Sequence, residues 1–167
     1  TIMLAVFALA IRTGTTNLGG VAERIGGDPV LAAHPGHILA FFAFFIVMVA
    51  ENGRLPVDNP ATHLELTMIH EAMVLEYSGH YLALVQWAGA MKLFLFLTLL
   101  ANLFFPWWIP TDVAALPMLL GALALAGKLV LLAAALAVIE TAVAKLRLFR
   151  VPELLAGSFA LAVLSVA

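Results

Sequence analysis

Residues 51–79 read ENGRLPVDNPATHLELTMIHEAMVLEYSG, and this polar stretch interrupts a chain that is otherwise mostly apolar. It holds five of the ten carboxylates and two of the five histidines of the 167-residue chain. Hydrophobic runs flank it on both sides. A polar segment between membrane spans is either a water-facing loop or a site at the membrane surface, and the density of ionisable groups favours a site.

The composition is that of an integral membrane protein. Hydrophobic residues make up 64% of the chain and charged residues 11%, with a mean hydropathy of +1.09. Soluble globular domains are roughly half apolar and a quarter charged. We therefore predict an all-α, polytopic bundle of transmembrane helices. Because both ends of the chain lie within apolar runs, we interpret it as a fragment of a longer protein.

The apolar runs predict about five membrane spans, of which the terminal two are truncated. The second span should begin near Pro35, since proline is favoured in the first turn of a helix. The glycine-rich residues 12–34 are expected to form a loop, and FFPWWIPTD at 104–112 an interfacial turn. The predicted spans of this single transmembrane domain are residues 1–11, 35–50, 81–105, 113–143 and 153–167.

Counting the spans alternately places residues 51–79 and 145–153 on the same side of the membrane. Cytoplasmic loops carry an excess of lysine and arginine. That side carries four basic residues and the opposite side two, which predicts that 51–79 and 145–153 are cytoplasmic. The four are Arg54, Lys145, Arg147 and Arg150, and the two are Arg12 and Arg24.

Within the polar stretch, the sequence RLPVDNP at 54–60 breaks any helix that continues from Ala50, because residues before proline avoid helical geometry. From Thr62 the pattern changes. Thr62 stands three residues before Glu65, the spacing of a helix-capping box. A short amphipathic helix is therefore predicted from about residue 63 to residue 77.

On this predicted helix Glu65 and Glu76 share one face, while His63 and His70 share another. Carboxylates in a low-dielectric setting rise in pKa and histidine titrates near neutral pH, so the combination suits proton handling. The alternative, an ordinary solvated amphipathic helix lying on the membrane, stays open.

The sequence argues against a metal or cofactor bound by this chain. It has no cysteine, so it cannot supply thiolates to a zinc ion or an iron–sulfur cluster. His70 and Glu71 begin an HExxH pattern, but position 74 is Val, so the second histidine is missing. A net charge of −2 and the lack of a phosphate-binding glycine loop argue against nucleic-acid binding.

Charged residues inside the predicted spans are further candidates. Lys92 lies near the middle of its span, where a charge costs roughly 2.5–3.5 kcal/mol, so it should face a partner or water. Lys128 lies near the middle of the next span, and Glu140 lies near the cytoplasmic end of that span. Snorkelling to the interface and a purely structural ion pair are the alternatives to a functional role.

The polar stretch resembles a known family. ENGRLPVDNPATHLEL followed by LEYSG is similar to ETNRxPFDxPEAExEL and EYSG of the membrane subunit 1 family of respiratory complex I. It is closer to the branch of formate hydrogenlyase subunit 4 and hydrogenase-4 component C, which belongs to the group 4 [NiFe]-hydrogenases. ETAVAKLRLFRVPELL at 140–155 resembles the next cytoplasmic loop of that branch.

The resemblance implies a multi-pass subunit of a bacterial or archaeal inner membrane, with no redox centre of its own. It implies cytoplasmic partners carrying a [NiFe] centre and iron–sulfur clusters, and antiporter-like membrane subunits that move protons or sodium. The positions that match the family pattern are Glu51, Arg54, Asp58, Glu65 and Glu76. Depth and charge add further candidates, so the proton-coupling candidates are Glu51, Glu65, Glu71, Glu76, Lys92, Lys128 and Glu140. The partner-docking candidates are Arg54, Asp58, His63 and His70.

The chain departs from the quinone-using members of the family. It has Pro-Ala-Thr-His at 60–63 where they have PEAE, and Val57 where they have phenylalanine. The missing carboxylates and aromatic ring argue against a quinone headgroup site and favour the hydrogenase branch. Two alternatives stay open: subunit 1 of a quinone-reducing complex I, and an inert membrane anchor for soluble redox subunits.

Overall fold

The computed structural model describes residues 2–57, 74, 76–110, 114–143 and 150–166, and in these residues all regular structure is helical, which confirms the predicted all-α class. A helix lies in each of the ranges 35–50, 81–105 and 113–143 that the apolar runs predicted as spans, and two short helices lie in residues predicted as a loop. The helices are α1 (Ile2–Thr13), α2 (Leu18–Gly27), α3 (Pro29–Ala33), α4 (Pro35–Glu51), α6 (His80–Phe104), α7 (Ala115–Ala142) and α8 (Val151–Leu164).

The prediction of a loop over residues 12–34 is wrong, because this segment contains α2 and α3. The side chain of Asn17 caps α2 by accepting a hydrogen bond from the Gly19 N–H, and Asp28 caps α3 in the same way. Val21, Ala22 and Ile25 form a buried stripe on α2. A helix with three such apolar positions folds here despite its glycines because that stripe packs on the bundle.

Two described helices, α6 with 25 residues and α7 with 28, are long and apolar enough to cross a membrane. Taken together, α1 and α2 would make a third candidate, bent by 57° at the break between them. The apolar helices α4 and α8 have 17 and 14 residues. The predicted count of about five spans is therefore not confirmed.

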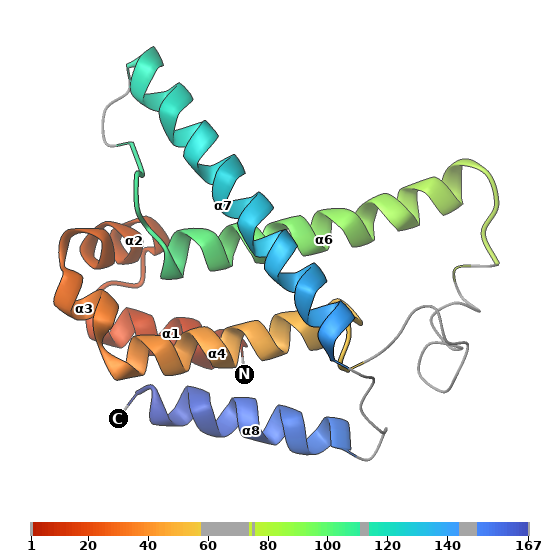
Figure 1. Cartoon of the computed structure of the whole chain (residues 1–167), viewed down its shortest axis with the longest axis horizontal. Helices are drawn as coiled ribbons and strands as arrows, with labels where there is room; N and C mark the ends of the chain where they lie inside the picture. The colour runs from red at the N-terminus through yellow and green to blue at the C-terminus, as the bar shows by residue number, and fades with distance from the viewer. Residues whose placement is uncertain (1, 58–73, 75, 111–113, 144–149, 167) are drawn as a thin grey trace.

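The core lies where α4 packs against α1, α6 and α8 (Figure 1). Small residues allow the helix backbones to approach closely, as is usual in membrane bundles. Phe44 fills the centre of this core, and its ring meets those of Phe96 and Phe104 on α6. The fully buried alanines are Ala5, Ala8, Ala40, Ala43, Ala101 and Ala162.

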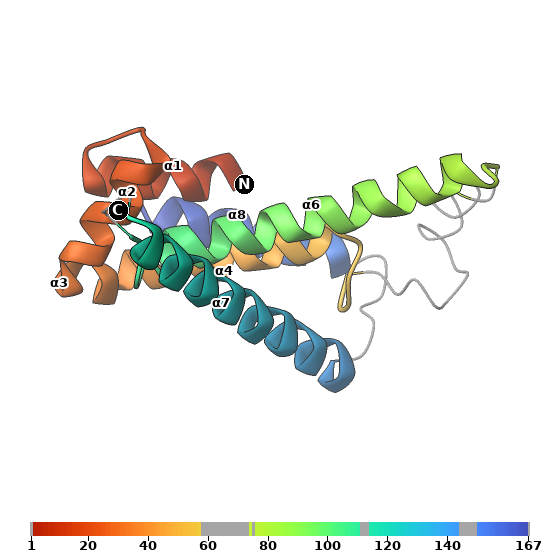
Figure 2. The ribbon, with the colours of Figure 1, turned by 90° about the horizontal axis from the view of Figure 1, so that it is seen from above.

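The N-terminal part of α6 extends beyond the ends of α4 and α8. Figures 1 and 2 show it passing the C-terminal end of α4 and the N-terminal end of α8. On this part the side chains of Leu84, Trp87 and Met91 are exposed, and the buried positions of α6 begin at Leu97. The middle of α6, rather than its start, therefore lies level with the end of α4.

Candidate functional site

Helix α4 ends in a tight turn that projects two of the predicted residues, Glu51 and Arg54. Gly53 adopts φ +57°, the left-handed conformation that glycine tolerates best. Its N–H donates to the carbonyl of Ala50, and the Arg54 N–H donates to the carbonyl of Val49, at 3.2 and 3.0 Å. This pair of bonds is a Schellman motif, which ends the helix and fixes the direction of both charged side chains.

Lys92 of α6 contacts the end of α4. Its Nζ donates to the backbone oxygen of Glu51 at 2.6 Å and lies 3.2 Å from the Glu51 carboxylate. The two side chains are 46% and 51% exposed. A cation at the C-terminal carbonyls of a helix is favoured by the helix dipole. The sequence predicted that Lys92 faces a partner or water, and the structure shows that it contacts Glu51.

Arg54 forms the second ion pair. Its Nη1 donates to the carboxylate of Glu140 on α7 at 3.3 Å, and the two side chains are 39% and 23% exposed. We call Glu51, Arg54, Lys92 and Glu140 the charge cluster. It holds two acids and two bases, and it connects α4 and its turn to both α6 and α7.

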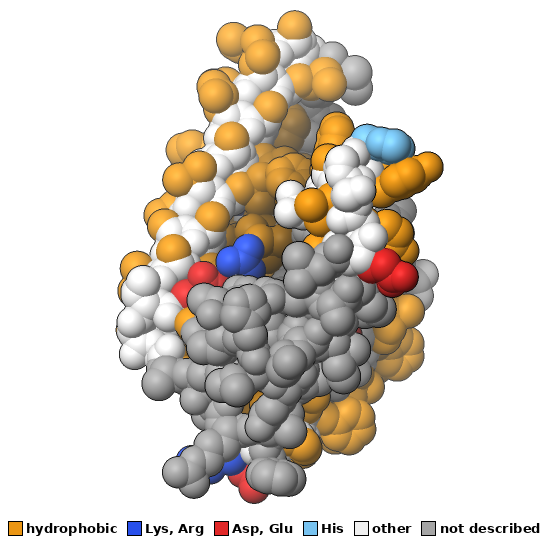
Figure 3. Space-filling model, turned by 90° about the vertical axis from the view of Figure 1, so that its right-hand side faces the viewer, with side chains coloured by type: hydrophobic (Ala, Val, Ile, Leu, Met, Phe, Trp, Pro, Cys, Tyr) orange, Lys and Arg blue, Asp and Glu red, His pale blue; other side chains and the backbone are white. Residues whose placement is uncertain are grey.

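The contact between Glu51 and Lys92 shows how far along α6 the charge cluster lies. Lys92 stands 12 residues after His80, so it lies about 18 Å along α6 from the start of that helix. The sequence predicted Lys92 near the middle of a span and Glu51 at the membrane surface, and the structure brings these two residues into contact. Figure 3 views this end of the molecule, where a few charged side chains lie among the mostly hydrophobic side chains of the described residues.

Two other predicted residues lie away from the cluster. Glu76 is exposed in the turn before α6, at the opposite end of the helix segment that leads to Lys92. The Nζ of Lys128 donates to the backbone oxygen of Trp107, on the connection between α6 and α7. Lys128 lies at the middle of α7, 12 residues or about 18 Å from Glu140, and its ammonium contacts the connection rather than the charge cluster.

Several predicted residues lie outside the described residues, and so does most of the helix predicted at 63–77. In the described parts of the chain, no group of three or more His, Asp or Glu side chains is placed to hold a metal ion. The predicted proton-coupling and docking residues that lie outside the described residues are Asp58, His63, Glu65, His70 and Glu71.

A second polar group, at the opposite end of the bundle, was not predicted. The Arg12 Nε donates to the backbone oxygen of Ser165 at 3.0 Å, and the guanidinium also contacts the ring of His34. Arg24 donates to the backbone oxygen of Thr13. The sequence offered one signal, a histidine on each side of Pro35-Gly36 at the start of an apolar run.

His37 lies deeper in this second group and is 6% exposed. Its Nε2 lies 3.4 Å from the backbone oxygen of Phe104, and the two rings are 5.1 Å apart. The apolar core around Phe44 and Phe96 separates it from the charge cluster at the other end of α4. The two polar groups are therefore distinct.

The sequence profile of the NADH dehydrogenase family matches residues 1–167, the whole chain. The chain belongs to this family. The finding agrees with the resemblance carried by residues 51–79. The matched residues include the helices that the charge cluster joins.

Curated relatives from three kinds of complex are similar to the chain. Formate hydrogenlyase subunit 4 of Escherichia coli (strain K12) is 27% identical over 98% of the chain and 52% of its own length. A subunit of the F(420)H(2) dehydrogenase of Methanosarcina acetivorans is 32% identical over 70% of the chain and 32% of its own length. A subunit of the NADH-quinone oxidoreductase of Bacteroides thetaiotaomicron is 25% identical over 68% of the chain and 31% of its own length.

The chain thus spans about half the length of the first of these relatives, and the matched segments cover about a third of the other two. No solved structure matches the chain. The described part of this chain is helical, and two of its helices are long and apolar enough to cross a membrane.

Proposed function

We propose that the chain is the membrane-anchoring and coupling subunit of an energy-converting [NiFe]-hydrogenase or formate hydrogenlyase complex. The match to formate hydrogenlyase subunit 4 over 98% of the chain supports this choice among the family's complexes. In this role the subunit links a hydrophilic electron-transfer arm to the movement of protons or sodium ions.

The observation that carries the proposal is the pairing within the charge cluster. Glu51 with Lys92 and Arg54 with Glu140 join three helices through two ion pairs. Each pair is partly shielded from solvent. One pair joins the end of α4 to the middle of α6, and the other joins the turn after α4 to α7. A change in the charge held near one pair therefore alters the forces on α4, α6 and α7 together, which is how a redox event in an attached partner can bias a membrane helix.

The electron carriers of the proposed complex lie in other subunits. The expected partners are a large subunit with the [NiFe] centre and iron–sulfur subunits, docked where residues 51–79 meet the end of α4. Antiporter-like membrane subunits would contact the bundle laterally. The exposed apolar faces of α6 and α7, with side chains such as Leu84, Met91, Leu123 and Leu131, support contact with lipid or membrane subunits.

The proposed orientation places the charge cluster towards the cytoplasm. Arg54 and Arg150 lie at that end of the described bundle. The two arginines of the opposite side, Arg12 and Arg24, each donate to a backbone oxygen at the end of another helix or turn. These contacts account for their presence on the side that the positive-inside rule assigns to the exterior.

The alternative within the family is a quinone-reducing complex, and the similarity to a subunit of NADH-quinone oxidoreductase favours it. Val57, which stands where quinone-using members have phenylalanine, is buried in the core. An inert anchor is the alternative from another class. It predicts that neutralising Lys92 or Lys128 changes stability and nothing else, whereas replacing Arg54 or Asp58 releases the soluble partners.

Purification of the tagged full-length protein from its native membrane tests the proposal. Mass spectrometry of the co-purified subunits should find a large nickel–iron subunit, and the complex should evolve hydrogen and resist quinone-site inhibitors. A partner set built around a quinone-reducing arm, with inhibitor sensitivity, would replace the proposal by the complex I alternative.

A further inference from the structure

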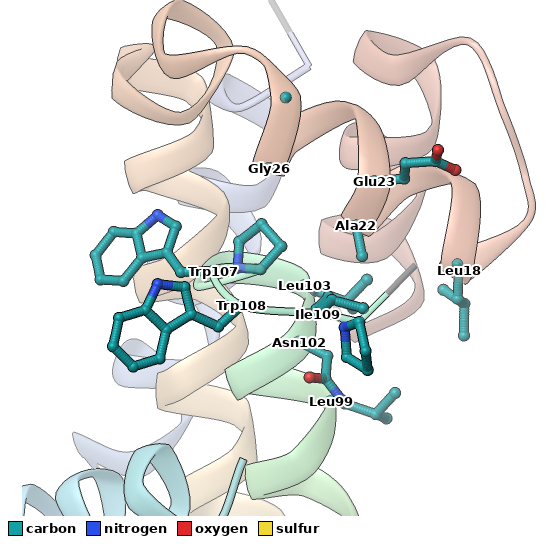
Figure 4. Close-up of a pocket in the computed structure, with 14 residues that line it drawn as sticks. Leu18, Ala22, Glu23, Gly26, Leu99, Asn102, Leu103, Trp107, Trp108 and Ile109 are labelled. Atoms are coloured by element: carbon teal, nitrogen blue, oxygen red, sulfur yellow. The ribbon is translucent and has the colours of Figure 1, made fainter. Parts of the chain in front are cut away.

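The connection between α6 and α7 separates two cavities at the end of the bundle opposite the charge cluster. Residues 107–110 line both cavities. The first, of about 1060 Å³, lies between this connection, α2 and the end of α6, and it includes Glu23 and Asn102. Figure 4 shows both indole rings, of Trp107 and Trp108, on the side of the connection away from Glu23.

The second cavity is an open groove of about 960 Å³ between residues 107–110 and the first half of α7. Its lining is apolar apart from one charged side chain. Representative lining residues are Trp107, Pro110, Pro117, Leu120, Leu123 and Lys128.

The charge in this groove is the ammonium of Lys128. Its contact in the described residues is the backbone oxygen of Trp107, which carries no formal charge. The acidic residue of α7, Glu140, is paired with Arg54 at the other end of the helix. Lys128 is half-buried, so its positive charge faces an apolar groove without a carboxylate from the described chain to balance it.

Two features favour an interfacial position for the ammonium, although Lys128 itself lies at the middle of α7. Tryptophan rings concentrate at membrane–water interfaces, and Trp107 and Trp108 are 61% and 84% exposed. Because the Lys128 ammonium contacts the Trp107 carbonyl, it snorkels to the same level.

We propose that this groove binds an anionic phospholipid, with its phosphate at Lys128 and an acyl chain along α7. The ammonium complements the phosphate charge, and the apolar residues that line the rest of the groove suit a hydrocarbon chain. A free phosphate would leave that lining unfilled. The lipid binds independently of the proposed redox role, so the site stands or fails separately from it.

Two glycines of equal environment supply a matched test. A Cβ added to Gly127 meets no atom within 4 Å, and Gly127 lines the groove. Gly89 on α6 is also free of neighbours within 4 Å but lies outside the groove. Gly127→Leu therefore adds a side chain at the groove whose Cβ meets no neighbour, while Gly89→Leu adds the same side chain elsewhere on a membrane helix.

The experiment titrates the purified full-length protein in detergent with phosphatidylglycerol or phosphatidylcholine and counts bound lipids by native mass spectrometry. Phosphatidylglycerol should bind more tightly. Lys128→Gln should weaken its binding about fivefold, the factor for losing one charge at a membrane surface, while Lys128→Arg retains binding. Gly127→Leu should abolish the retained lipid, and Gly89→Leu should not change it.

Any of three results would overturn the proposal. The first is wild-type binding of phosphatidylglycerol by both Lys128→Gln and Gly127→Leu. The second is equal affinity for the two lipids. The third is a loss in Gly89→Leu as large as the loss in Gly127→Leu, since this would reflect a general effect of the added side chain.

Discussion

Replacing Lys92 by methionine should destabilise the protein more than replacing its partner Glu51 by glutamine. The Lys92 ammonium makes two contacts with Glu51, at 2.6 Å to the backbone oxygen and 3.2 Å to the carboxylate. Glu51→Gln removes the carboxylate charge and leaves the backbone oxygen in place. Lys92→Met removes both contacts and exposes the end of α4 without its cation.

The magnitudes follow from the exposure of the pair. Side chains that are 46% and 51% exposed form an ion pair worth about 0.2–1 kcal/mol, so Glu51→Gln should cost about 0.5 kcal/mol. A hydrogen bond from a charged group is worth about 1.5–3 kcal/mol when shielded, and partial exposure lowers this one to roughly the bottom of that range. Lys92→Met should therefore cost about 2 kcal/mol, and the double variant about the same.

The assay is reversible unfolding of the purified full-length protein in mixed micelles, followed by circular dichroism. Thr98→Val on α6 is the control, because the Thr98 hydroxyl bonds to Phe94 within its own helix. Equal costs for the two substitutions at the ion pair, or a Lys92→Met cost no larger than that of Thr98→Val, would refute the described contact.

Three further substitutions test other parts of the structure by the same unfolding measurement. Arg54→Ala and Glu140→Gln should each cost up to about 1 kcal/mol, and the double variant should cost less than their sum; strict additivity would contradict the ion pair. Gly53→Ala should cost about 1 kcal/mol because of its φ of +57°, and a neutral effect would contradict the Schellman turn. Gly121→Ala should cost about 1–3 kcal/mol because its Cβ would lie 2.5 Å from the Pro110 ring, and unchanged stability would contradict that packing.

The helices could be predicted from local patterns. Apolar runs of sufficient length located α4, α6 and α7 within a few residues, and Pro35 marked the start of α4. The helices of residues 12–34 were missed because glycines and polar residues outnumber the short apolar stripe on α2. The α2 segment forms a helix because this stripe packs on the bundle, and such packing cannot be predicted from the local sequence.

The partners within the charge cluster could not be predicted. Glu51 and Lys92 are 41 residues apart in the sequence, and their contact depends on how far α6 slides along α4. Depth along each helix ranked Lys92 and Lys128 alike, yet Lys92 pairs with a carboxylate and Lys128 bonds to a backbone carbonyl. Spacing along one helix carries no information about what a neighbouring helix presents.

The central claim is that the charge cluster couples redox chemistry in partner subunits to ion movement. The measurement that tests it most directly is the number of ions transported per hydrogen molecule evolved by the intact complex in sealed vesicles. Glu51→Gln combined with Glu140→Gln breaks both ion pairs and should lower this ratio while the complex stays assembled and evolves hydrogen. An unchanged ratio in an assembled, active double variant would contradict the claim.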